Sequence, residues 1–176
     1  RGTSSTSDGY HTVDRFYHDS ANNDESPTFA QVDVNSSDAG ENPYAKGFTK
    51  AFKITNGNQT GGARTNSYAR VSTVLEAAEL RNSGWDYTNP NSILSVSFWA
   101  KSSKAGTYCV ALNSQDASPN LDIIKEYTLV ANTWKHVEFE IPGNSSLVID
   151  DDNGSGMNFL WALVTGTGRQ LAAGSW

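Results

Sequence analysis

The clearest strand pattern in the chain is Leu94-Ser95-Val96-Ser97-Phe98-Trp99-Ala100-Lys101. Successive side chains of a β-strand point to opposite faces of the sheet. The segment therefore predicts a strand that buries one set of side chains, Leu94, Val96, Phe98 and Ala100, and turns the other set outward, Ser95, Ser97, Trp99 and Lys101. Such alternation is typical of a sheet that packs against a core on one side only.

Segments of similar character lie on both sides of this strand, and Gly, Pro, Asn or Asp bound each of them. We expect further strands at residues 10–17, 28–34, 48–55, 65–75, 107–112, 123–129, 135–141 and 158–164, and at most two helical turns at residues 75–81. Many short strands joined by turns predict an all-β jelly-roll sandwich. Residues 1–9 are expected to form a flexible N-terminal arm, and residues 10–176 a single domain, with the chain an excerpt of a longer protein or completed by a neighbouring subunit.

Composition narrows the function. Thirteen Lys and Arg against nineteen Asp and Glu leave a net charge of -6, which repels the phosphates of a nucleic acid. No stretch approaches the roughly 18 apolar residues of a membrane span, so a soluble protein without nucleic-acid or membrane partners is expected. The single cysteine, Cys109, lies in an apolar run and is expected to be a buried, inert thiol.

The alternation of side chains along the predicted strands also places residue types that suit glycan binding on the outward faces. Sugars are bound by flat apolar rings, together with amides, carboxylates and guanidinium groups that engage the hydroxyls. On the outward faces we expect Trp99, Trp134, Tyr68, Arg70, His136 and Glu138. The alternative for each Trp is a packing role, because Trp is usually largely buried.

The densest acidic cluster is Asp150-Asp151-Asp152, followed by Asn153-Gly154. These carboxylates are the candidate ligands for a hard cation such as Ca²⁺, although no Glu lies twelve positions on, as an EF-hand would require. The alternative is a solvated turn. No metal-binding His pair, nucleophile elbow or phosphate-binding loop motif occurs, so we predict that the domain is not an enzyme.

Three segments, residues 94–101, 106–112 and 133–143, resemble strands of jelly-roll carbohydrate-binding modules, which are galactose-binding-like sandwiches. Together with residues 1–6, 12–16 and 172–176 they are also similar to domains of bacteriophage tail-fibre and other virion-surface proteins. This resemblance implies an oligomeric tail-fibre, decoration or receptor-binding domain on the virion surface that adheres to host glycans, contacts other virion proteins and could hold a structural Ca²⁺. The alternatives are a carbohydrate-binding module attached to a glycosidase, and a purely structural virion protein.

Overall fold

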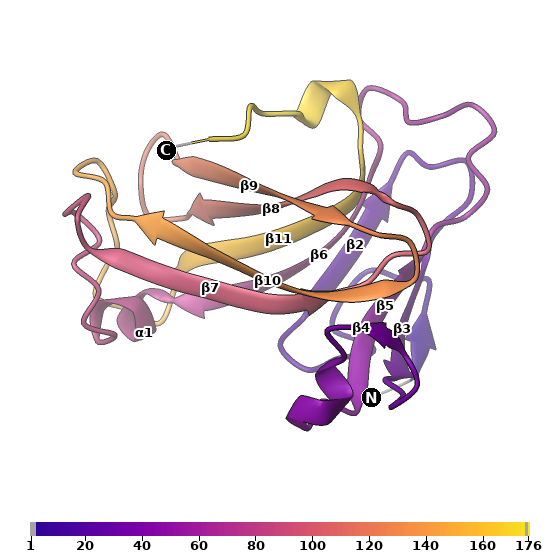
Figure 1. The fold of residues 1–176 in the computed structure, drawn as a ribbon. Coiled ribbons are helices and arrows are strands. Elements are labelled where there is room, and N and C mark those ends of the chain that lie inside the picture. Colours follow the sequence, from indigo (N-terminus) through magenta and orange to yellow (C-terminus); the bar gives the residue numbers. More distant parts are fainter. Residues whose placement is uncertain (1–2, 175) are drawn as a thin grey trace.

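The computed structural model describes residues 3–174 and 176, and it is built almost entirely of strands (Figure 1). The strands are β1 (Ser4–Ser5), β2 (Tyr17–Ala21), β3 (Thr28–Asp33), β4 (Ala39–Gly40), β5 (Lys50–Thr55), β6 (Tyr68–Glu76), β7 (Ile93–Ala100), β8 (Gly106–Ser114), β9 (Asp122–Leu129), β10 (Thr133–Pro142) and β11 (Ser155–Thr165). The helical elements are α1 (Ala77–Arg81) and the short 3-10 helices η1 (Pro43–Lys46) and η2 (Thr167–Arg169). The predicted all-β sandwich class is confirmed.

The strands form three sheets. The largest has the order β2-β6-β11-β8-β9, and the two smaller ones have the orders β4-β10-β7 and β1-β3-β5. All pairs of neighbouring strands are antiparallel except β4 and β10, which run parallel over residues 39–40 and 133–134. In Figure 1, β7 and β10 cross in front of the large sheet, and β3, β4 and β5 gather near the N-terminus.

Both smaller sheets cover the same face of the large sheet. His18, Val71 and Trp161 are cross-strand partners on β2, β6 and β11, so their side chains share one face. On this face the Trp161 ring meets Phe98 of β7 at 5.4 Å between centroids, and His18 stacks on Phe29 of β3 at 4.1 Å. The opposite face of the large sheet carries the other set of partners, such as Tyr17, Ser72, Leu160 and Ala111.

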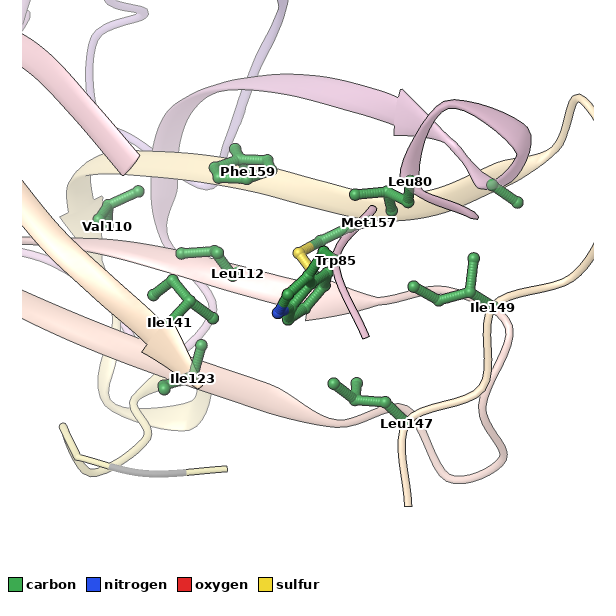
Figure 2. Close-up of a cluster of buried hydrophobic side chains, with 11 residues drawn as sticks. Leu80, Trp85, Val110, Leu112, Ile123, Ile141, Leu147, Ile149, Met157 and Phe159 are labelled. Carbon is green, nitrogen blue, oxygen red and sulfur yellow. The ribbon is translucent and has the colours of Figure 1, made fainter. Parts of the chain in front are cut away.

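The main core lies between the large sheet and the β7–β10 pair. Figure 2 shows its buried side chains, which come from β8, β9, β10, β11, α1 and two loops: Leu80, Trp85, Val110, Leu112, Ile123, Ile141, Leu147, Ile149, Met157 and Phe159. Leu94, Val96 and Phe98 of β7 pack against this cluster, while Ser95 and Ser97 are exposed. The alternation predicted for residues 94–98 is therefore confirmed.

Two sequence predictions about the N-terminal region differ from the structure. The strand predicted at residues 10–17 begins only at Tyr17, because Arg15 has a φ of 63° that turns the chain just before it. The flexible arm predicted over residues 1–9 instead pairs Ser4 and Ser5 with β3, and Gly9 bridges to His18; residues 1 and 2 lie outside the described residues. Ser4 and Ser5 thus extend the β3–β5 sheet, whereas Gly9 joins the edge of the five-stranded sheet at β2.

The helical prediction is close to what the structure shows. Residues 75–81 were rich in helix formers, and α1 covers the last five of them, where it buries Ala77 and Leu80 at the end of the core. Across the part of the chain that the structure describes, no helix has both the length and the apolar character needed to cross a membrane.

Candidate functional site

Three rings form a column on the outer face of the β7–β10 pair. The register of the two strands sets Trp99 opposite His136, and their ring centroids are 4.2 Å apart. Phe48 approaches the Trp99 ring at 4.9 Å, and half of its surface is exposed. Phe48 reaches this place because the chain leaves η1 through Gly47, whose φ of 91° favours glycine. An aromatic surface therefore lies on a sheet face that water can reach.

Polar groups border this ring column. Along the same outer face, Glu138 is opposite Ser97 and Glu140 is opposite Ser95, and all four residues are exposed. The Nδ1 atom of His136 lies 3.2 Å from Oε1 of Glu138. The Glu41 carboxylate accepts a 2.7 Å hydrogen bond from the backbone N–H of His136. Carboxylates and hydroxyls thus stand beside the rings, where a polyhydroxylated ligand could bond to them.

A groove of about 630 Å³ adjoins the column between β9 and β10. It is lined by Thr107, Glu126, Tyr127, Thr128, Lys135, His136, Val137, Glu138 and Phe139. Lys135 spans it by donating from Nζ to the carbonyl of Thr128 at 3.1 Å. His136 belongs both to the ring column and to the lining of the groove, and Glu138 lines the groove beside it, so the two features adjoin.

Trp134 lies on the outward side of β10 but is packed. Only 9% of its surface is exposed, and its indole N–H donates to the Asp38 carboxylate at 3.0 Å. Lys101 lies over the ring at 5.2 Å and pairs with the same carboxylate at 3.1 Å. Gly40 passes so close that a Cβ there would meet the Trp134 carbonyl at 2.2 Å. The segment around β4 therefore covers the Trp134 ring, which has the packing role weighed as its alternative.

Asp38 gives this packing a pH dependence. The hydrogen bonds from Trp134 and Lys101 lower the pKa of Asp38, because both favour its charged form. Its stabilising effect should be complete above the ordinary Asp pKa of about 3.9 and be lost as the pH falls through the lowered folded-state pKa. We expect Asp38→Ala to lower the melting temperature at pH 7 and to melt with the wild type near pH 2, as measured by circular dichroism. An equal deficit at both pH values would contradict this role.

Tyr68 and Arg70 lie apart from the ring column. Both are on β6, in the five-stranded sheet, and on the face that neither smaller sheet covers. The structure therefore brings Trp99, His136 and Glu138 together and places Tyr68 and Arg70 on the opposite side of the sandwich. The sequence predicted that these outward side chains would share one surface. In the structure they lie on two separate surfaces.

The acidic cluster at residues 150–152 is arranged as a turn. Asp152 accepts from the backbone N–H of Gly154 at 2.8 Å, and Asp151 lies 4.0 Å from Arg81. The backbone N–H of Asp150 donates to Asp116 at 3.0 Å. Within residues 3–174 and 176, no group of three or more His, Cys, Asp or Glu side chains is placed to hold a metal ion. The three carboxylates predicted as Ca²⁺ ligands do not form such a group: those of Asp151 and Asp152 make separate local contacts, and Asp150 is held through its backbone N–H.

Two residues of the site were missed by the sequence analysis. Phe48 was assigned to a strand, whereas it lies in the connection before β5, and Glu41 was not singled out. An aromatic residue directly after Gly47, among polar neighbours, was the one available signal for Phe48. Nothing in the local sequence connects Glu41 with His136, since the contact joins residues 95 positions apart.

Comparison with known proteins assigns no function to individual residues of this chain. No family model matches the chain, and the search of curated proteins finds no match. Among solved structures, the chain is similar to a Clostridium thermocellum endo-1,4-beta-D-xylanase 10B structure that comprises CBM22-1 and GH10 modules complexed with xylohexaose. The identity is 11% and the TM-score 0.37; the match covers 84% of this chain and 27% of that chain. The chain thus spans about a quarter of that structure, and no equivalence between individual residues follows.

Proposed function

We propose that this domain is a non-catalytic carbohydrate-binding module whose ligand lies along the Phe48–Trp99–His136 column. The observation that carries the proposal is the column itself: three rings in contact, tilted to one another by 45° and 32°, on an accessible sheet face bordered by exposed carboxylates and hydroxyls. The flat apolar face of a sugar fits an aromatic ring, and its hydroxyls need acceptors and donors close by.

The rings differ in exposure, and this difference assigns them different roles in binding. Phe48, half exposed, presents the ring surface that a sugar would meet first, and Trp99 supports it from behind. The carboxylate of Glu138, whose side chain is 70% exposed, accepts from sugar hydroxyls beside His136. The groove between β9 and β10 then gives room for further sugar units of a chain, with Lys135 and Glu126 as polar partners.

This proposal reverses the order of the functions expected from the sequence. Both the first expectation and its alternative, a carbohydrate-binding module attached to a glycosidase, included glycan binding; the alternative now comes first because the ring column and its polar border support saccharide binding and have no bearing on a virion role. A virion-surface location, virion partners and a homo-oligomer stay predictions that rest on sequence resemblance. The binding experiment below gives the same answer whichever parent protein carries the domain.

We expect Phe48→Ala and Trp99→Ala each to weaken binding to a neutral polysaccharide at least about tenfold, since each removes a ring contact. Affinity electrophoresis against a panel of soluble xylan, mixed-linkage glucan, galactomannan and dextran would identify the ligand, and calorimetry would give the dissociation constants. The matched control is Val148→Ala, which removes an exposed apolar side chain in the loop between β10 and β11.

The two ring variants should keep the wild-type melting temperature within a few degrees, because Phe48 is half exposed and Trp99 lies on the outer face. Wild-type binding that survives both substitutions would place the ligand elsewhere. No retention on any polysaccharide by the folded wild type would remove the proposed function.

A further inference from the structure

We propose that the uncovered face of the five-stranded sheet holds a second site, for a saccharide that carries a carboxylate, and that Arg169 is its anion-binding group. The site is separate from the ring column, because β6 and η2 lie on the other side of the sandwich from β7 and β10. It does not depend on the proposed function of that column.

The centre of the site is the Tyr68 ring, which two arginines approach. The guanidinium carbons of Arg70 and Arg169 each lie 4.7 Å from the centroid of this ring. Such contacts hold a guanidinium in place without using its N–H donors. Arg169 belongs to η2, whose Gly168 donates to the Thr65 carbonyl at 2.9 Å, so the backbone of this turn is tied to the segment that precedes β6.

The two arginines differ in how many of their N–H donors remain free to bind a ligand. Arg70 forms a two-point ion pair with Asp19, from Nε at 2.8 Å and from Nη2 at 2.9 Å, and Asp19 is buried. Arg169 is exposed, and among the described residues its side chain has no hydrogen-bond or ion-pair partner. An oriented guanidinium with unused donors is therefore presented to solvent beside a second, already neutralised one.

The geometry of a guanidinium selects the class of ligand. Its planar pairs of N–H groups match the two oxygens of a carboxylate, and such charged hydrogen bonds are stronger than neutral ones. The net charge of -6 opposes binding of an anion at long range, but this repulsion is screened beyond about 10 Å at 0.1 M salt. Arg169, whose charge is not neutralised by an ion pair among the described residues, then decides the sign of the local interaction.

The neighbouring surface suits a sugar rather than a free carboxylate. Tyr17 of β2 is on the same face as Tyr68, offset by four residues along β6, which is about 13 Å. Tyr10, half exposed, meets Tyr17 edge to face at 5.2 Å between centroids. One short acidic oligosaccharide, such as a chain of hexuronate units, would span both positions, with a carboxylate at Arg169 and a sugar ring near Tyr17.

The experiment is a calorimetric titration of the whole chain with oligogalacturonate, oligomannuronate and a neutral galactose oligomer of the same length, at 20 mM and 300 mM NaCl. The variant is Arg169→Gln, and its matched control is Lys53→Gln, which makes the same charge change at an exposed position of β5. A sulfated galactose oligomer is a further arm, because a sulfate ester presents similar oxygens to a guanidinium. Melting temperatures of both variants are measured in parallel.

We expect the wild type to bind a hexuronate oligomer, more weakly at 300 mM NaCl, and Arg169→Gln to lose about tenfold or more in affinity, whereas Lys53→Gln keeps it. Binding of the hexuronate by Phe48→Ala as well as by the wild type would separate this site from the ring column. No binding by the wild type, equal loss in both variants, equal binding of the neutral oligomer, or a preference for the sulfated oligomer would each overturn the proposal. A lowered melting temperature of Arg169→Gln with unchanged hexuronate affinity would overturn it too, since Arg169 would then only fasten η2 to Tyr68.

Discussion

Trp85→Ala should lower the free energy of unfolding by about 3–5 kcal/mol, the usual cost of removing a large buried aromatic side chain. Trp85 is 7% exposed and belongs to the core cluster with Met157 and Ile141, as Figure 2 shows. Its indole N–H also donates to the Ser92 carbonyl at 3.1 Å, which holds the loop before β7. The truncation leaves a cavity and removes that hydrogen bond, so both effects lower stability in the same direction.

Chemical denaturation followed by circular dichroism measures this loss. The comparison variant is Trp85→Phe, which keeps most of the buried surface and loses the N–H donor; it should lose less than half as much as Trp85→Ala. If Trp85→Ala costs under about 0.5 kcal/mol, the range typical of surface substitutions, the loop after α1 does not close the core as described.

The second large effect is a loss of stability in mild acid that comes from His18. This residue has no exposed surface, stacks on Phe29, and within the described residues neither of its ring nitrogens has a hydrogen-bond partner. Burial, and secondarily the nearby His11, lower its pKa, while Asp8 and Asp19 partly oppose that change. Above the ordinary His pKa of about 6.5 both folded and unfolded states are neutral here, so His18 adds no pH dependence.

Below that pH the unfolded chain binds a proton at His18 and the folded chain does not, so stability falls until the lowered folded-state pKa is reached. His18→Leu should remove this fall between pH 6.5 and more acid conditions. It should also stabilise the protein at pH 7 by about 1–2 kcal/mol, because a buried group without hydrogen bonds is replaced by an apolar one. Val148→Ala, which changes an exposed side chain that does not titrate, is the control, and it should keep the wild-type pH dependence. An identical acid-induced fall in His18→Leu would show that other groups cause it.

Local alternation was sufficient to predict most strands and their buried faces. Residues 94–101 show why: a strict period of two leaves one assignment for Val96 and Phe98, and β10 repeats it with Val137 and Ile141. The same rule turned Trp99, His136 and Glu138 outward together, and the antiparallel pairing of β7 with β10 then made them neighbours.

The rest of the candidate site depends on contacts that are distant in the sequence. Trp134 has the outward parity, but Asp38 reaches it from 96 residues away and the ring is covered. Tyr68 and Arg70 also have an outward parity, yet the pairing of β6 with β2 and β11 puts them on a different sheet. Parity along one strand says which side chains share a face, and it does not say which sheet that face belongs to.

Phe48 illustrates a different limit of sequence reasoning. It lies outside any strand, and it becomes part of the site only because η1 and Gly47 direct the chain across the outer face of β7. The exposed phenylalanine would otherwise be interpreted as one of the scattered apolar residues found on any protein surface.

The most direct test of the proposed function is a titration of the 15N-labelled domain with the neutral oligosaccharide selected by affinity electrophoresis, followed by two-dimensional NMR. Binding along the ring column predicts the largest saturable shifts at the backbone amides of Phe48, Trp99, His136 and Glu138 and at the Trp99 indole N–H, with the buried Trp85 indole N–H unchanged. Saturable shifts confined to β2, β6 and η2, or none at concentrations that retard the protein on a polysaccharide gel, would contradict the assignment of the Phe48–Trp99–His136 column as the carbohydrate-binding face.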